Sequence, residues 1–132
     1  MTGSSDNAID LWILNKKKPI FSLEGVHQND SWVLQTDNIR NSDLICSGSY
    51  DGSVMLYGFR KQKKDFAVLG RLTNLPGCIN ALKFAHARSA DMMNKQSQMM
   101  LAVSHSGEER LGRWHVQKNV KEGITILKRK SD

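Results

Sequence analysis

The sequence holds little cysteine, little proline and no long apolar run, and each scarcity excludes a class of protein. Cys46 and Cys78 are the two cysteines among 132 residues, without a CxxC pair or a histidine at metal-ligand spacing. This excludes a disulfide-rich scaffold and favours two buried thiols in a reducing compartment. No window approaches the roughly 18 apolar residues of a membrane span, and residues 2–6 do not resemble a secretory signal. We therefore expect no membrane partner.

Acidic residues are also in short supply. The 19 lysines and arginines outnumber the 13 aspartates and glutamates, which gives a formal net charge of +6 and a pI near 9.5. A basic balance favours an acidic partner, and nucleic acid is the commonest one. Ordinary soluble domains are also often basic, so the charge alone leaves RNA binding and mere solubility equally open. With 39% apolar residues, a packed core is expected rather than disorder.

No catalytic or metal-binding pattern is present. The histidines at positions 27, 86, 105 and 115 are scattered, without an HExxH motif, a nucleophile elbow or a glycine-rich phosphate loop. Within Ser104-His105-Ser106, neighbouring strand side chains point to opposite faces, so a hydrogen bond between them has poor geometry. Asp51 is better explained as a turn carboxylate than as a general base. The sequence therefore predicts a protein that is not an enzyme and that needs no cofactor or metal.

An internal repeat organises the chain. Residues 2–12 (TGSSDNAIDLW) and 47–57 (SGSYDGSVMLY) align without gaps at an offset of 45 residues, and residues 104–114 (SHSGEERLGRW) add a third copy, 57 residues further on. Asp51-Gly52 is a hairpin dipeptide, and Asn7 tolerates the same left-handed backbone conformation. The Glu108-Glu109 pair is a poorer turn, so we expect the last turn to differ.

Each copy predicts strand, turn and strand, flanked by further strands. The expected strands are 31–36 and 78–84 upstream, 44–49 and 53–59 within the middle copy, and 20–23, 66–72 and 124–127 downstream. Four short strands per unit of roughly 45 residues are typical of a propeller blade. The extra residues of the last unit fall at 87–98, a polar and methionine-rich surface loop. No segment outside it has the apolar spacing of a helix.

These residues resemble the WD40 repeat family. The repeat ending stands as Asp10-Leu11-Trp12, Met55-Leu56-Tyr57 and Gly112-Arg113-Trp114, although the aspartate that usually follows the aromatic residue is missing. Gly25-Val26-His27 matches the Gly-His element with one residue inserted. The resemblance implies an all-β, partial WD40-type propeller, with half a blade and two blades of four antiparallel strands. The implied units are the end of one blade at 1–27, a blade at 28–75 and a last blade at 76–130.

The family also has a buried hydrogen-bond set that joins a histidine, a strand serine, a turn aspartate and an aromatic residue. The resemblance places this set at His27, Ser47, Asp51 and Tyr57, where the tyrosine hydroxyl takes the part of an indole N–H. The corresponding repeat positions elsewhere are Asp6, Trp12 and Trp114. All seven residues are expected to have structural roles.

A narrower resemblance covers the last two units. The string RLGRW at 110–114, residues 75–84 (LPGCINALKF) and residues 47–52 are similar to the WD40 subunits of the U3 small nucleolar ribonucleoprotein. This implies a nucleolar scaffold that binds U3 RNA near its box B/C element, beside a kink-turn-binding protein and other small-subunit processome proteins, in pre-ribosomal RNA processing. The alternative is a general WD40 protein–protein scaffold without direct RNA contact.

Half a blade and two blades do not close a ring, because propellers have four to eight blades. An incomplete blade leaves strand edges and an apolar face open. We therefore expect the remainder of a larger propeller to be a partner of these residues. Residues 124–127 are expected to form an outer edge strand or the strand that closes the ring.

Clustered basic residues are the candidate binding site. Lys16–Lys18 and Arg60–Lys64 occupy equivalent positions in successive units, so we expect one basic stripe that contacts phosphates, continued by Lys118 and Lys121. The alternative is that these loops carry lysine for solubility. Arg110 and Arg113 are candidates for a specific phosphate or base contact, or for pairing with Glu108 or Glu109. The full set is Lys16, Lys17, Lys18, Lys61, Lys63, Lys64, Arg110, Arg113, Lys128, Arg129 and Lys130.

Overall fold

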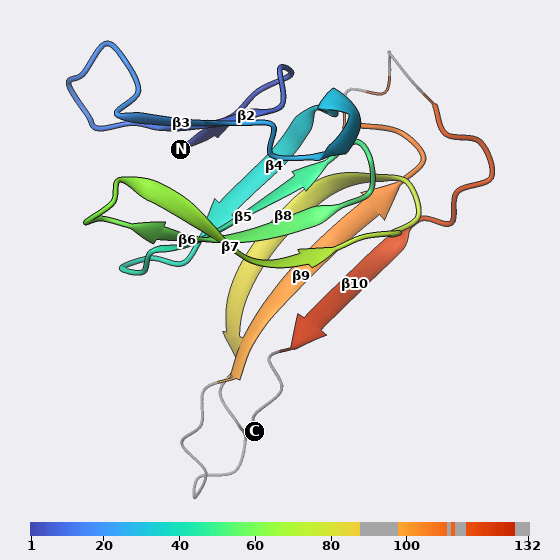
Figure 1. Ribbon diagram of the computed structural model, residues 1–132. Helices are drawn as coiled ribbons and strands as arrows, with labels where there is room; N and C mark the ends of the chain where they lie inside the picture. Colours follow the sequence, from blue (N-terminus) through green and yellow to red (C-terminus); the bar gives the residue numbers. More distant parts are fainter. Residues whose placement is uncertain (88–97, 111, 113–115, 129–132) are drawn as a thin grey trace, which may run out of the picture.

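The computed structural model describes residues 1–87, 98–110, 112 and 116–128. Within these residues the chain forms three antiparallel sheets and one short 3-10 helix, η1 (Gln28–Asp30) (Figure 1). The strands are, in the first sheet, β1 (Thr2–Gly3), β2 (Ala8–Leu11) and β3 (Phe21–Glu24); in the middle sheet, β4 (Val33–Asn38), β5 (Leu44–Ser49), β6 (Val54–Arg60) and β7 (Asp65–Leu72); and in the last sheet, β8 (Cys78–Ala87), β9 (Gln98–Ser106) and β10 (Gly123–Lys128). No helix in this part of the chain is long and apolar enough to cross a membrane.

The middle sheet is a complete blade. Its strands lie in the order β4-β5-β6-β7, so that strands consecutive in the chain are hydrogen-bonded neighbours within this sheet. The turns that join them have the expected chemistry, since Gly52 has a φ of +74° and its repeat equivalent Asn7 has a φ of +60°. The expected all-β, partial propeller is therefore confirmed.

The last sheet differs from the expected four strands. Its order is β10-β9-β8, and Ile124 pairs with Ser104 of β9. Residues 124–127 therefore form an edge strand, as expected, but they pair directly with β9 and are not a fourth strand. In the described part of 107–122, the only strand-like pairing is an isolated bridge between Glu108 and Val116. The physical reason is local, because Gly112 and Asn119 both have positive φ values, which interrupt a strand. The adjacent β-branched run Ile124–Ile126 therefore pairs with β9 instead.

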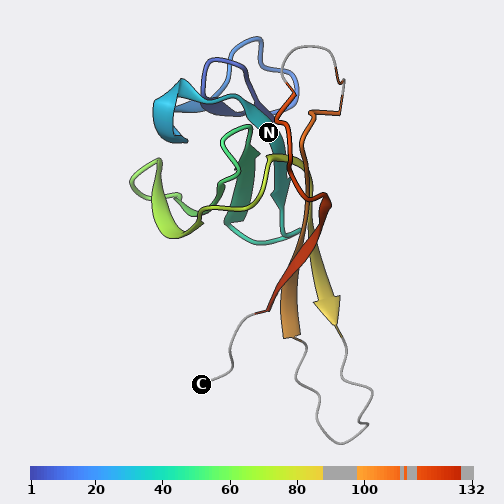
Figure 2. The same ribbon diagram turned by 90° about the vertical axis from the view of Figure 1, so that its right-hand side faces the viewer.

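The three sheets lie side by side, with the middle one between the other two (Figures 1 and 2). An apolar core fills each interface. Between the first and middle sheets it contains Ile9, Val26, Val33, Ile45, Met55 and Tyr57. Between the middle and last sheets it contains Cys46, Val54, Ile79, Leu82, Leu101 and Val103. Both cysteines are buried free thiols, as expected, and burial raises the pKa of Cys46 to about 12.

The glycine of the repeat allows the sheets to approach closely. A Cβ on Gly48 would lie 2.4 Å from Cγ2 of Ile79 in the last sheet, and a Cβ on its repeat equivalent Gly3 would lie 2.5 Å from Cγ1 of Val33 in the middle sheet. Side chains in folded proteins almost never approach so closely. The same repeat position therefore serves the same packing role at both interfaces.

Candidate functional site

The basic loops of the first two units line one groove. The loop between β2 and β3 and the loop between β6 and β7 enclose a groove of about 950 Å³. Its basic residues are Lys16, Lys17, Lys18, Lys61 and Lys64; the others are Ile13, Asn15, Pro19, Ile20, Phe21 and Phe59. Among these described lining residues none is acidic. The structure thus brings together five of the six loop lysines that the sequence suggested.

Edge-to-face phenylalanine contacts hold the two loops side by side. Phe21, which begins β3, lies 45 residues before its repeat equivalent Phe66 in β7. Their ring centroids are 5.0 Å apart, and the centroids of Phe21 and Phe59 are 6.4 Å apart, with the rings edge to face in both pairs. Such contacts add roughly 0.5–1.5 kcal/mol beyond area burial. The aromatic contacts therefore fix the spacing between the lysines of the two loops.

Carboxylates neutralise some of the basic residues beside the groove. Arg60 makes a bidentate pair with Asp65, with Nε–Oδ1 and Nη2–Oδ2 distances of 2.7 and 2.5 Å, and hydrogen bonding from Arg60 lowers the pKa of Asp65. Lys63 does not line the groove and also favours ionised Asp65. Lys61 lies 3.5 Å from Asp43, but both side chains are mostly exposed, so this pair contributes little.

The basic stripe does not continue into the last unit, and this part of the prediction is wrong. The turn 50–52 joins β5 to β6, whereas the loop 61–64 joins β6 to β7, so the two lie at opposite ends of the middle sheet. Gln117 donates from Nε2 to the carbonyl oxygen of Tyr50, at 3.3 Å. Lys118 and Lys121, which follow Gln117 closely, therefore lie near the turn 50–52 and away from the loop 61–64. They lie there because β10 pairs with β9 in the position expected for the third strand.

Arg110 is also separate from the groove. It lines a second pocket of about 380 Å³ with Leu34, Gln35, Asn80 and Glu109. Gln35 pairs with Gly48, close to the turn 50–52, so this pocket lies at the end of the middle sheet opposite the groove. None of the ion pairs among the described residues joins Arg110 to Glu108 or Glu109. Lys128 is exposed at the end of β10. The candidates Arg113, Trp114, Arg129 and Lys130 lie outside the described residues.

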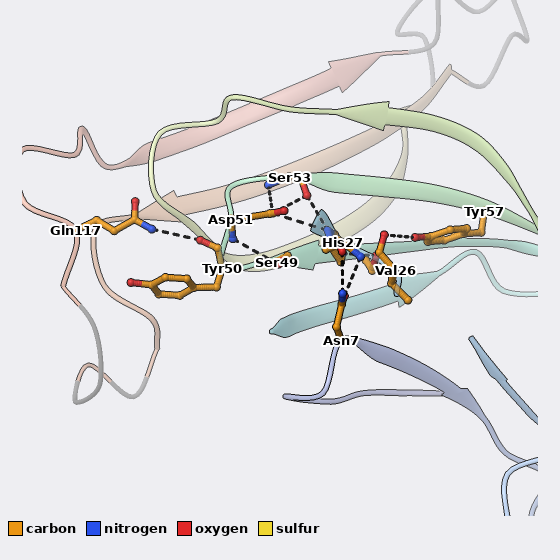
Figure 3. A network of polar contacts seen from close by, with 10 residues as sticks. Asn7, Val26, His27, Ser49, Tyr50, Asp51, Ser53, Tyr57 and Gln117 are labelled. Atoms are coloured by element: carbon orange, nitrogen blue, oxygen red, sulfur yellow. Dashed lines mark hydrogen bonds and ion pairs between the residues drawn. The ribbon is translucent and has the colours of Figure 1, made fainter. Parts of the chain in front are cut away.

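A buried polar network links the first and middle sheets near the turn 50–52 (Figure 3). Oδ1 of Asp51 accepts from the Ser53 backbone N–H at 2.8 Å and from the Ser53 hydroxyl at 2.6 Å. Because that hydroxyl hydrogen points to Asp51, the Ser53 oxygen accepts from Nδ1–H of His27, at 2.7 Å. Nε2 of His27 then accepts from the Ser47 hydroxyl, at 2.8 Å. The network fits a neutral imidazole, and burial lowers the pKa of His27 to about 4, against the opposing effect of Asp51.

The structure therefore brings His27, Ser47 and Asp51 together, and it adds Ser53, which the sequence reasoning missed. The Tyr57 hydroxyl donates to the carbonyl oxygen of Val26, at 3.3 Å, one residue before the histidine. Burial raises the pKa of Tyr57 to about 12. The sequence did contain a signal for Ser53, because it stands two residues after Asp51. In turns, an aspartate side chain often accepts hydrogen bonds from the backbone N–H and the hydroxyl of the residue two positions later.

In the first unit the aromatic and hydroxyl residues at the corresponding positions bond directly to each other. The indole N–H of Trp12 donates to the hydroxyl of Thr2, at 3.0 Å, at the repeat positions of Tyr57 and Ser47. Asp6 accepts from the hydroxyl of Ser4. These contacts are more exposed than those of the middle unit, since the Trp12 side chain is 41% exposed.

Asn7 is a second residue of the buried polar network that the sequence reasoning missed. Its side chain is 1% exposed, and it closes a two-way clamp on His27. Nδ2 of Asn7 donates to the His27 carbonyl at 2.7 Å, and Oδ1 of Asn7 accepts from the His27 backbone N–H at 2.8 Å. The clamp joins the hairpin of the first sheet to the segment that enters the middle sheet.

Replacing Asn7 by glycine is expected to lower the free energy of unfolding by about 2 kcal/mol, because two buried backbone groups of His27 lose their partners. Glycine tolerates the positive φ of this position, so the loss of stability reports the contribution of the Asn7 side chain alone. The control is Asn41→Gly, at an exposed position with a φ of +60°, which should change stability little. Urea denaturation measures both, and equal midpoints for the two variants would rule out the clamp as a source of stability.

The chain is similar to known proteins over nearly its whole length. No family model matches it. The U3 snoRNP-associated protein-like EMB2271 of Arabidopsis thaliana is 31% identical, covering 96% of this chain and 27% of that protein. The U3 small nucleolar RNA-interacting protein 2 of Homo sapiens is 28% identical, covering 96% of this chain and 26% of that protein. The chain thus spans about a quarter of the length of the curated relatives it matches.

A solved structure gives the same assignment. A crystal structure of RRP9 WD40 repeats has a TM-score of 0.74 at 27% identity and covers 96% of this chain and 38% of that chain. A structure of U3-55K matches with the same values. The gap-free repeat, the four-stranded middle blade and these matches agree with one another. The chain forms part of a WD40 propeller and is similar, over 96% of its length, to a part of the WD40 proteins of the U3 small nucleolar ribonucleoprotein.

Proposed function

We propose that the chain is a non-enzymatic WD40 scaffold that contacts RNA directly through its lysine groove, within a U3-type ribonucleoprotein. The names of the relatives support this, since they include U3 small nucleolar RNA-interacting protein 2 and, in Saccharomyces cerevisiae, ribosomal RNA-processing protein 9. The proposed partners are U3 small nucleolar RNA, a kink-turn-binding protein and other small-subunit processome proteins. The proposed place of action is the nucleolus, in pre-ribosomal RNA processing.

The observation that carries the proposal is the arrangement of charge in the groove. Five lysines from two repeat-equivalent loops surround it, and no described lining residue is acidic. Lysines gathered around one groove act as phosphate contacts, which position an RNA without reading its sequence. The chain as a whole carries +6, which favours the approach of an anionic partner.

Removing one groove lysine from each loop should weaken RNA binding in a salt-dependent way. For the Lys16→Gln/Lys64→Gln variant, we expect the slope of log affinity against log salt to fall by about 1.4, at roughly 0.7 per lost phosphate contact on a single strand. Fluorescence anisotropy with a U3 box B/C RNA, between about 50 and 200 mM salt, measures this. The matched control is Lys118→Gln/Lys121→Gln, which removes the same charge at the opposite end.

Equal slopes for the two variants would mean that the groove lysines make no specific contribution. An intact protein whose RNA affinity does not depend on either pair would instead favour a WD40 scaffold that holds only proteins.

A further inference from the structure

The lysine groove has two chemically different parts. Its five lysines, which we call the rim, are exposed, whereas five of its other lining residues, which we call the floor, are apolar, namely Ile13, Pro19, Ile20, Phe21 and Phe59. Ile13 is 50% exposed and Ile20 is 43% exposed, so part of this apolar floor faces water. Phosphate contact alone needs no such floor, because lysines on a polar surface neutralise phosphates equally well.

The floor does not belong to one sheet alone. It is built from residues of two adjacent sheets, with Phe21 from β3 and Phe59 from β6. Phe59 packs on Phe66 of β7, with ring centroids 5.2 Å apart, and Phe66 packs on Phe21. Phenylalanine contacts therefore join the first and middle sheets at the floor.

The ligand that matches both parts carries negative charge along a backbone and a flat apolar group beside it. Duplex RNA offers phosphates, but its bases are stacked inside the helix, so it would leave the floor exposed to water. A single strand offers both features, because its unstacked bases can lie on aromatic or apolar side chains while its phosphates meet lysines. A groove of about 950 Å³ is large enough for a nucleotide-sized ligand.

We propose that the groove binds an unpaired RNA segment, with phosphates on the lysine rim and a base on the apolar floor against Phe59. This proposal rests on the proposed RNA-binding function and specifies which form of RNA the groove selects. The rim accounts for affinity that falls with salt. The floor accounts for a preference for single strands with little dependence on base identity, since every base has an apolar face.

The test compares single-stranded and duplex RNA of equal length on the full chain, by fluorescence anisotropy at one salt concentration. We expect the single strand to bind at least tenfold more tightly. Phe59→Leu, which keeps an apolar side chain in the packing against Phe66, should reduce single-strand affinity by about tenfold, within the range measured for base stacking, and should leave duplex affinity unchanged. The control is Val68→Ala, on an exposed β7 residue outside the groove.

A second readout does not depend on how well a variant folds. A single strand that carries 2-aminopurine should change its fluorescence on binding to the unaltered chain, because the base leaves its stacked neighbours for the floor. Equal affinity for duplex and single strand, or no effect of Phe59→Leu, would overturn the unpaired-RNA proposal, while the lysine dependence would still support RNA binding. An acidic peptide that binds the groove more tightly than either RNA would overturn both proposals.

Discussion

Gly48→Ala is expected to lower the free energy of unfolding by about 1–3 kcal/mol, the usual cost of overpacking a core. The added methyl group would lie 2.4 Å from Cγ2 and 2.9 Å from Cβ of Ile79. Ile79 is fully buried in β8 and belongs to the core between the middle and last sheets, so it cannot turn away into solvent. The two sheets must therefore move apart, which loosens the packing of the whole interface.

Gly70→Ala is the matched control. This glycine also lies in a strand, but its added methyl group would lie 3.6 Å from Cδ1 of Leu56, an ordinary contact distance. Both variants are compared by urea denaturation, where a fall in the midpoint at constant slope reports stability. Equal midpoints for the two variants would contradict the close packing of the sheets.

A double variant locates the clash. Ile79→Ala alone should cost about 2–5 kcal/mol, because it leaves a cavity in the core. Combined with Gly48→Ala, it should cost clearly less than the sum of the two single changes, since the smaller side chain makes room for the methyl group. Strict additivity would show that the effect of Gly48→Ala arises somewhere other than this contact.

Acid is expected to destabilise the fold through His27. Its pKa is lowered by burial from 6.5 to about 4 in the folded chain, whereas in the unfolded chain it stays near 6.5. Between these two values the unfolded state binds a proton that the folded state does not bind. Stability is therefore unaffected by this group above pH 6.5, falls as the pH drops toward 4, and levels off below it. The full loss is up to about 3 kcal/mol, at 1.36 kcal/mol per pKa unit.

His27→Gln removes the titration but keeps an amide that can hydrogen-bond to the serines on either side. We expect this variant to be less stable than the natural chain at pH 7, since the amide fits the two serine hydroxyls less well. The difference between the two proteins should shrink as the pH falls from 6.5 to 4. Urea denaturation over this range measures it, and a difference that stays constant would show that His27 does not titrate as its burial implies.

The sequence predicted the turns and most strands well because their signals are local. Asn7 and Gly52 stand at equivalent repeat positions, and both adopt positive φ values, as their residue types require. The strand β10 was correctly expected at an edge, but its partner was not, because its β-branched residues predict a strand without predicting which strand it pairs with. The partner of β9 is decided by the turns at Gly112 and Asn119, which lie between β9 and β10. It was not apparent from the sequence that these turns would interrupt the expected strand.

The candidate site was predicted in part for the same reason. The offset of 45 residues was sufficient to bring Lys16 and Lys61 to one groove. The apolar floor was missed, although Phe21 and Phe66 stand at the same offset, because Phe59 has Leu14 as its repeat counterpart and gives no periodic signal. Asn7 was missed as a clamp since its partner is the backbone of His27, 20 residues away, and backbone partners leave no pattern in the sequence.

Lysine acetylation of the full chain with and without RNA tests the lysine groove most directly. With a single-stranded U3 segment bound, mass spectrometry should show protection concentrated at Lys16, Lys17, Lys18, Lys61 and Lys64, and reaction at Lys118 and Lys121 unchanged. Protection spread evenly over all lysines, or strongest at Lys118 and Lys121, would contradict the groove as the RNA contact.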